Sequence, residues 1–358
     1  MGVMVGFSHF QSIDFGLNQN QGVTFPRARV IEVLYDGTEI DTTGIRMGRQ
    51  DLLVEITSGA YRGEIVNVQN LLFLGQSVYA EAGSRVILYF ERVEGEMDYF
   101  ARIQSYERMF GIYFLVSVFI GLLGAVFGKA GLRSAFSLVF SFVVIIFFLI
   151  PAIVAGGPPA MLTVFSSLLI VTVSLISITG FERKTLVSLL GTVIGIVCYI
   201  VFYHWMSWVL SISGFNVQQM STIIVIGFNT PVGISQLLFS GILIASLGAI
   251  MDVAVSLSSV ISELSASKAN TAFKGLFKAG MAVGKDMIGS SSNTLILAFA
   301  GTFFISLIIF RTNSLSVDMI INSADIGIEV LRSLSASSAM VLTAPATAAI
   351  GAYIYSKK

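Results

Sequence analysis

The sequence predicts an integral membrane protein, an α-helical bundle of about seven transmembrane helices preceded by a small all-β domain. Three observations support this fold class. The 358-residue chain is 55% hydrophobic and only 12% charged, with a mean hydropathy of +0.84, far more apolar than an ordinary globular protein. Its character changes near Arg108, where alternating polar and apolar runs give way to long apolar segments. Each of these segments is about 20 residues long, the length that a spanning helix needs.

Residues 1–25 are predicted to be a flexible segment and residues 26–107 a small extracytoplasmic β-barrel domain. Apolar side chains alternate with polar ones in runs separated by Gly, Ser and Asp turn signals. The runs predict strands at Arg27–Tyr35, Leu52–Ile56, Glu64–Asn70, Arg85–Glu91 and Tyr99–Tyr106. That number of strands fits a closed barrel of the oligonucleotide/oligosaccharide-binding or SH3-like type.

The composition of this β domain says little about a ligand. It contains arginine but no lysine, and its acidic residues outnumber its arginines, so a polyanion is not expected. Barrels of this size serve many unrelated functions. We interpret the domain as a rigid spacer or docking module, with ligand binding as the alternative.

Residues 108–358 are predicted to form the transmembrane domain, because each spanning segment is a nearly unbroken apolar run. The predicted spans are Phe110–Phe127, Ala135–Val154, Ala160–Ile178, Leu186–Leu210, Gly233–Leu257, Thr294–Phe310 and Leu334–Tyr355.

The cations predict the orientation of these spans. Lysines and arginines follow the first, third, fifth and seventh spans, whereas the connections Gly156–Pro159 and Ser211–Pro231 carry none. By the positive-inside rule the C-terminus is cytoplasmic and the N-terminal domain lies outside. Met1–Pro26 contains no apolar segment that would export this domain, so we expect an upstream anchor or signal.

An amphipathic stretch, residues 266–288, connects the fifth and sixth spans. One side carries Phe273, Leu276, Phe277 and Met281, and another carries Lys274, Lys278 and Lys285. This pattern is typical of a helix that lies in the cytoplasmic membrane interface against anionic lipid. The alternative is that the stretch couples the two spans mechanically.

Asp252 is the most informative residue, because it lies within the apolar segment Val232–Ile261 and no other carboxylate occurs between Glu182 and Asp252. A charge in hydrocarbon costs on the order of 3 kcal/mol, so a residue kept there is a functional hypothesis. A stripe of small residues, Gly241, Ala245 and Gly248, leads to it at steps of three and four. Such stripes face other helices. The alternative is that Asp252 lies at the inner boundary, solvated by headgroups.

The same spacing of polar residues occurs on the last three spans, and we expect these spans to pack around a shared polar seam. The candidate ion- or proton-coupling residues are Asp252, Ser256, Asp286, Ser290, Asn293 and Glu329. Besides Asp252, four of them have structural alternatives. Asp286 suits the start of a helix, Asn293 suits a hydrogen bond between helices, and Glu329 is placed to pair with Arg332. Ser256 suits helix packing with a satisfied hydroxyl.

Other chemistry is not indicated. The sequence has two histidines and one cysteine, so a His/Cys metal site is not expected. The segment from Gly280 to Asp286 is one residue too short for a phosphate loop and ends in Asp where Ser or Thr would hold magnesium. A formal net charge of zero argues against a nucleic-acid partner. We predict no catalytic residues, no metal and no cofactor.

Three segments resemble the YibE/F-like family of multispanning bacterial membrane proteins. They are Phe181-Glu-Arg-Lys184, Gly248-Ala-Ile-Met-Asp252-Val-Ala-Val-Ser256 and the stretch from Gly280 through Asn293 to Gly301. The resemblance covers nearly the whole chain, including the β domain, and it implies architecture more than activity. A weaker similarity, treated as analogy only, is to one half of a resistance-nodulation-division permease or of the SecD/SecF export subunits. Those proteins couple proton movement to substrate movement through intramembrane acids.

We therefore expect a protein of the bacterial inner membrane that is an ion- or proton-coupled permease or exporter, or a subunit of one. Burial disfavours the charged form of a carboxyl, so Asp252 would be the titrating group. One alternative is a non-transporting scaffold or partner subunit that associates with a paralogous chain or a second copy. A membrane enzyme acting on a lipid-linked substrate is the least favoured alternative, and it would need Asp252 and Asp286 to face one cleft.

Overall fold

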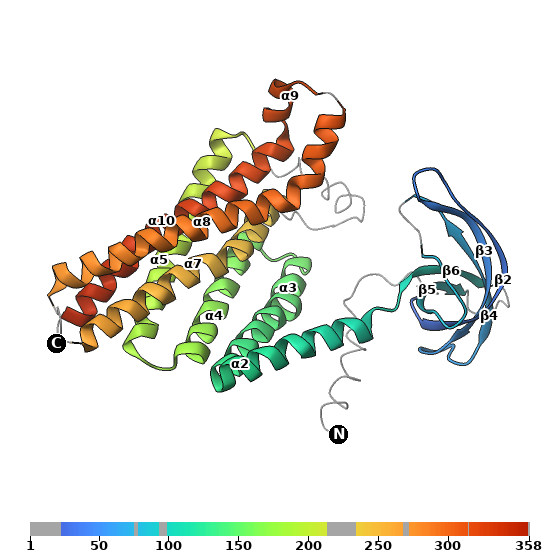
Figure 1. The fold of residues 1–358 in the computed structure, drawn as a ribbon, viewed down its shortest axis with the longest axis horizontal. Coiled ribbons are helices and arrows are strands. Elements are labelled where there is room, and N and C mark those ends of the chain that lie inside the picture. The colour runs from blue at the N-terminus through green and yellow to red at the C-terminus, as the bar shows by residue number, and fades with distance from the viewer. Residues whose placement is uncertain are drawn as a thin grey trace. The chain divides into compact units, whose positions relative to one another are not determined.

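The computed structural model describes residues 23–74, 78–92, 99–212, 234–267, 272–313 and 315–356. The chain forms two compact units that meet in sequence between Gly121 and Leu122, and each is described by itself (Figure 1). The predicted flexible segment 1–25 lies almost entirely outside the described residues. The same is true of most of the connection Ser211–Pro231 and of residues 268–271 in the amphipathic stretch.

The first unit contains a curled antiparallel sheet, an open half-barrel (Figure 1). Its hydrogen-bonded order is β1-β5-β2-β3-β4, and β6 pairs with the other edge of β5. The ends of the sheet approach each other where the backbone N–H of Asn67 in β4 donates to Tyr99 Oη of β6 at 2.9 Å. The described strands are β1 (Val23–Thr24), β2 (Arg27–Ile40), β3 (Arg46–Ile56), β4 (Ile65–Leu72), β5 (Arg85–Arg92) and β6 (Tyr99–Tyr106).

The five predicted strands are confirmed, because alternate side chains do point into one core. Leu52, Val54 and Ile56 of β3 are fully buried, and every second residue of β4 is buried. The structure extends β2 and β3 beyond the predicted runs into a long hairpin closed after Ile40. Most side chains at this end of β2 are exposed, so no period-two burial pattern marked it in the sequence.

Two buried amide side chains, Gln50 and Asn70, attach a segment without strand structure to the sheet. Gln50 bonds both backbone groups of Ala80, accepting from its N–H at 3.2 Å and donating to its carbonyl at 3.1 Å. Asn70, directly opposite Gln50 on the neighbouring strand, donates to Gln50 Oε1 and to the Val78 carbonyl. Residues 78–80 are therefore held by side chains where a strand would use its own ladder.

The helices begin in the first unit and fill the second. Among the described residues, six helical stretches are long and apolar enough to cross a membrane. The elements are α2 (Met109–Val144), the π-helical turn η2 (Ile145–Leu149), α3 (Ile150–Val154), α4 (Pro159–Thr179), α5 (Arg183–Val209), α7 (Ile234–Ala266), α8 (Phe273–Thr312), α9 (Val317–Ile321) and α10 (Ala324–Ser356).

The first apolar stretch contains two of the seven predicted spans. It has 46 residues, so a straight helix would be about 69 Å long, more than twice the thickness of the hydrocarbon core. Gly128 instead adopts φ 57° and ψ −131°, a conformation that favours glycine. A Cβ on Gly124 would lie 3.3 Å from the side chain of Leu132, although residues eight apart are about 12 Å apart along a straight helix. The chain therefore reverses at Gly128, and the predicted bundle of about seven spans is confirmed.

Helix α10 is the centre of the second unit, where it contacts α5, α7 and α8 (Figure 1). Its approach to α5 depends on two glycines of α5. A Cβ on Gly191 would collide with Thr347, and a Cβ on Gly195 would collide with Thr343. The hydroxyls of both threonines donate to backbone carbonyls of α10 itself. The two helices can therefore lie close together without leaving either hydroxyl unpaired.

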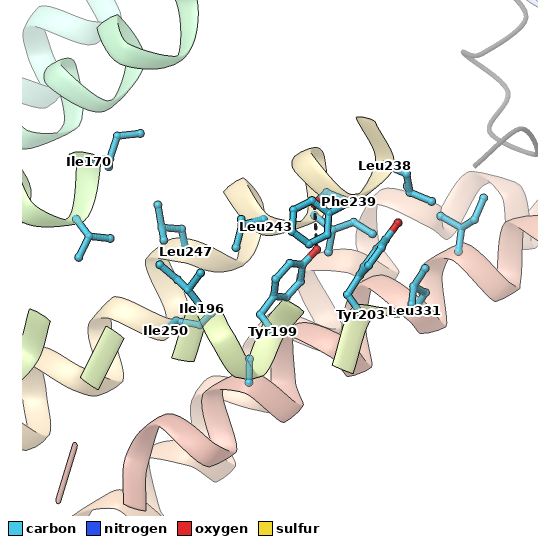
Figure 2. Packing of buried hydrophobic residues seen from close by; sticks show 14 of the residues in the cluster. Ile170, Ile196, Tyr199, Tyr203, Leu238, Phe239, Leu243, Leu247, Ile250 and Leu331 are labelled. Carbon is cyan, nitrogen blue, oxygen red and sulfur yellow. Dashed lines mark hydrogen bonds between the residues drawn. The ribbon is translucent and has the colours of Figure 1, made fainter. Parts of the chain in front are cut away.

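The largest hydrophobic cluster among the described residues lies between α4, α5, α7 and α10 (Figure 2). Tyr199 is fully buried, and its hydroxyl donates to the Phe239 carbonyl of α7 at 3.0 Å. Tyr203 donates in the same way to the Ser235 carbonyl at 3.3 Å. Both rings also pack on the Phe239 ring. This cluster fixes α7 against α5 and so fixes which face of α7 remains outside.

The described part of the amphipathic stretch is the beginning of α8, which runs without interruption from Phe273 to Thr312. Leu276 is 1% exposed and packs with Ile261 of α7 and with α10. Gly280 and Gly284 are also buried. Phe277 and Met281 also pack against the cluster that contains Leu276, whereas Phe273 is exposed. Most of the apolar side of this stretch thus faces helices of the same chain, the arrangement expected if it couples the fifth and sixth spans mechanically.

Candidate functional site

Asp252 lies close to the middle of the 32-residue apolar stretch Ser235–Ala266 in α7. The helix continues for 14 residues beyond it, to Ala266, and the headgroup alternative stays open. Its side chain is exposed, on the face of α7 opposite the buried residues Ile250 and Ala254. It makes no hydrogen bond or ion pair with the described part of the chain. A carboxyl inside a membrane needs a polar partner or water, and no side chain among the described residues bonds this one.

The small residues that lead to Asp252 share its outward face. Gly241, Ala245 and Gly248 are all exposed. A Cβ added to Gly241 or Gly248 would meet no atom within 4 Å. Among the described residues no helix packs closely on this stripe, because the large apolar side chains of α7 occupy the opposite face. That the stripe faces another helix stays a prediction.

The polar residues of α8 also point outward. Asp286, Ser290 and Asn293 are exposed, and none of their side chains bonds another described residue. The helix-start alternative for Asp286 is wrong. Helix α8 begins at Phe273, about 20 Å before Asp286 at 1.5 Å per residue, and the helix dipole acts only within the first turn.

In α10 the alternative for Glu329 is confirmed. Its carboxylate pairs with Arg332 at 3.5 Å, and the Arg332 guanidinium lies 5.7 Å from the centre of the Phe299 ring of α8. The second oxygen, Oε1, is buried without a partner among the described residues. Glu329 also lines an apolar groove of about 310 Å³ between α8 and α10.

The candidate residues therefore form no shared seam among the described residues. The helices α7, α8 and α10 do pack together, mainly through apolar contacts such as the cluster of Val253, Leu257, Met340 and Ala344. A polar contact between α7 and α10 lies elsewhere, where the Tyr355 hydroxyl donates to Ser262 Oγ at 3.0 Å. Ser256 is half-buried and makes no hydrogen bond through its hydroxyl with any described residue. Spacing predicted that the polar residues share faces, but it did not predict which way those faces point.

A cavity of about 380 Å³ lies beside Asp252, between the second half of α2, α4 and α7. Its polar groups are the hydroxyls of Ser134, Ser137, Ser141 and Ser174. Ser137 is 6% exposed and Ser174 is 1% exposed, and neither hydroxyl bonds a described residue. Ile170 and Leu247 line the cavity from the apolar cluster (Figure 2).

The cavity is lined by neighbours of Asp252 in α7. Gly248, one turn before Asp252, and the adjacent Met251 both line it, whereas Asp252 does not. Ile145 of the π-helical turn lines it from α2. That turn precedes Pro151, which cannot donate a backbone hydrogen bond, and π-helical turns are frequent at functional sites.

Buried hydroxyls continue from the cavity along α4. Thr163, Ser166 and Ser167 are almost fully buried, and their hydroxyls have no hydrogen-bond partner in the described chain. Each unpaired buried hydroxyl costs about 1–3 kcal/mol. With Ser174 they form a polar track on the inner face of α4. Our sequence reasoning missed these residues, although Ser134, Ser137 and Ser141 recur at helical spacing.

A family model of YibE/F-like proteins matches residues 115–357. The chain belongs to the YibE/F-like family. This match includes all three segments on which the resemblance was recognised, so that prediction is confirmed. It begins at residue 115, and the β domain lies outside it, so the resemblance of that domain stays a prediction. Searches of curated proteins and of solved structures gave no match to this YibE/F-like protein.

Proposed function

We propose that this YibE/F-like protein is a subunit of an ion- or proton-coupled permease of the bacterial inner membrane, with Asp252 as the titrating group. One observation carries the proposal. A lone carboxyl lies at the middle of a spanning helix, next to Gly248 and Met251, which line a cavity with unpaired hydroxyls. Intramembrane acids are expensive, and where they occur they mark ion pathways and proton relays.

The serine-lined cavity supports a transport role. Hydroxyl groups can replace part of the hydration shell of a proton carrier or a small polar solute without adding a charge to the membrane interior. The buried, unpaired hydroxyls of Thr163, Ser166 and Ser167 extend this polar surface along α4. Buried polar groups that lack protein partners are typical sites for ordered water.

The exposure of Asp252 supports the role of a subunit. A mid-helix carboxyl on the outward face would meet lipid unless a second membrane protein covers it. The small residues around it would allow a helix of that protein to approach closely. The covering chain is a paralogous subunit or a second copy. The positive-inside rule supports an orientation with an extracytoplasmic β domain and a cytoplasmic C-terminus.

Carbodiimide labelling tests the role of Asp252 without knowledge of the substrate. Dicyclohexylcarbodiimide enters membranes and reacts with protonated carboxyls in an apolar environment. We expect peptide mass spectrometry of the protein in native membranes to find the modification at Asp252. The labelling should fall as the pH rises, because ionisation removes the reactive form. Asp252→Asn should lose the modification while keeping its level in the membrane.

Function is then measured as proton uptake into pyranine-loaded vesicles that carry the protein with its co-purifying subunits. Asp252→Asn should abolish uptake driven by a potassium diffusion potential. Asp318→Asn, an exposed acid in the short helix α9, is the matched control and should leave uptake unchanged. Full uptake by Asp252→Asn would refute the proposal.

A non-transporting scaffold or partner subunit is the second candidate function. It is favoured by the outward stripe of small residues on α7. It is also favoured by α8, whose most apolar segment is only 6% buried among the described residues. A scaffold needs the stripe for association but does not need the carboxyl. Under this alternative Gly241→Leu would separate the partner during co-purification, whereas Asp252→Asn would change neither the association nor any proton uptake.

A further inference from the structure

Four arginines gather at one end of the β sheet around a hollow of about 440 Å³. They are half of the eight arginines in residues 26–107. Arg27 and Arg29 lie at the start of β2, Arg85 begins β5, and Arg62 lies in the turn between β3 and β4. The domain is acidic on average, so its composition concealed this local concentration of positive charge.

Strand pairing produces the concentration. Arg29 and Arg85 are direct partners on the antiparallel strands β2 and β5. Thr57, just after β3, bonds the Arg27 carbonyl through its backbone N–H and its hydroxyl, which brings the following turn to the same place. That turn carries Arg62 between Gly59 and Gly63, whose φ angles of 85° and 90° lie in the region that favours glycine.

Among the described residues, the positive charges of the hollow are only partly balanced. Glu107 is the acid that lines the hollow, and its carboxylate lies 3.8 Å from Arg27. Arg29, Arg62 and Arg85 form no ion pair with any described residue, and Glu55, the partner of Arg29 on β3, is not within ion-pair distance. Like charges placed directly opposite on a sheet are destabilising, so the arrangement has a cost that a bound anion would remove.

We propose that this hollow binds a phosphate group. Guanidinium groups suit this ligand, because each presents planar N–H donors that match phosphate oxygens and remains charged at every physiological pH. Three unpaired guanidiniums fit the charge and the several acceptor oxygens of a phosphate better than a carboxylate, which has two oxygens. The volume leaves room for the group to which the phosphate is attached.

Two sources can supply the phosphate. One is a phospholipid headgroup, because the hollow lies close in sequence to the start of the first apolar helix. Helix α2 begins at Met109, two residues after Glu107. Its first turns expose large apolar side chains, such as Phe110 at 75% and Phe114 at 58%, as expected of a helix that enters lipid. The hollow is therefore close in the chain to the point of membrane entry, where phospholipid headgroups lie. The other source is free phosphate in solution.

Hydrogen exchange of the full chain in nanodiscs separates these sources. One arm uses phosphatidylcholine discs titrated with inorganic phosphate. The other uses discs with increasing phosphatidylglycerol in phosphate-free buffer. We expect slower amide exchange in residues 57–64 in at least one arm, and the arm identifies the source. A hydrogen bond to a charged group contributes roughly a factor of ten or more in affinity. Arg29→Gln combined with Arg85→Gln should therefore raise the ligand concentration needed to slow exchange about a hundredfold.

A matched control removes the same charge elsewhere in the domain. Arg46→Gln with Arg102→Gln alters two arginines that do not line the hollow and that lie over tyrosine rings. This variant should respond like the unaltered chain. The proposal is overturned if neither arm slows exchange, if the Arg29/Arg85 variant keeps the response, or if the control loses it equally. Exchange in β3 and β4 that is no faster than in the unaltered chain, measured without ligand, establishes that each variant is folded.

Discussion

In the β unit the buried amides of Gln50 and Asn70 are hydrogen-bonded to each other and to backbone groups, whereas in the helical unit several buried hydroxyls have no partner. The exception among the described β residues is Arg92 Nε. The difference extends to the surface, because the outward face of α7 carries Asp252 at mid-span. A single chain thus provides nearly all the polar contacts of its β unit, but its helical unit leaves polar positions for water, a solute or another subunit.

The largest expected effect contrasts the inner and outer faces of the helical unit. Gly191→Leu should lower its free energy of unfolding by roughly 3 kcal/mol, because the side chain would collide with Thr347 and separate α5 from α10. Unfolding in mixed micelles with sodium dodecyl sulfate measures this. Gly241→Leu, the same change where no atom lies nearby, should shift the isolated chain by less than about 0.5 kcal/mol. Equal losses would mean that the two faces do not differ.

The next effect tests the contrast in polar satisfaction. Gln50→Leu should lower the free energy of unfolding of the β unit by about 1–3 kcal/mol, because the buried N–H of Ala80 loses its acceptor. Ser166→Ala in α4 removes a hydroxyl that has no partner among the described residues and should be neutral or slightly stabilising. Peptide-resolved hydrogen exchange reads the two units separately. A clear loss in Ser166→Ala would show that its hydroxyl is bonded after all.

A smaller effect of opposite sign is expected at the arginine hollow. Arg85→Gln should stabilise the β unit by about 0.2–1 kcal/mol in phosphate-free buffer, because it removes the like charge opposite Arg29. The gain should shrink as salt is added, since salt screens the repulsion. Thermal unfolding followed by hydrogen exchange in β2 and β5 measures the gain in stability and its dependence on salt. A loss of stability would contradict the repulsion on which the anion site depends.

The smallest effect concerns acid. The Thr38 hydroxyl, which donates to Asp36 at 2.6 Å, and the Tyr79 hydroxyl hold the pKa of the Asp36 carboxyl below its ordinary value of 3.8. This contribution to stability is complete above the ordinary pKa and is lost as the pH falls through the lowered one. A pH series of unfolding temperatures should show a small extra loss in acid, and Asp36→Asn should remove that pH dependence.

The class of the protein and nearly all of its elements could be predicted from local patterns in the sequence. Period-two alternation placed the five strands because one side of each strand must be buried, and apolar length placed the spans because hydrocarbon thickness sets their size. Asp252 could also be singled out from the sequence, because the free-energy cost of its charge follows from the apolar residues on either side of it in the chain. These signals are local, and each can be read within about 20 residues.

Tertiary structure decided what depends on residues far apart in sequence. The packing of Tyr199 and its neighbours on α7 turned Asp252 outward, so the expected seam within the chain did not form. Pairing of β2 with β5 placed Arg29 opposite Arg85, although the two lie 56 residues apart. Packing of α2 and α4 likewise placed Ser137 and Ser174 in the lining of one cavity. A helix or strand fixes which of its residues share a face, but only the elements packed against it decide what that face meets.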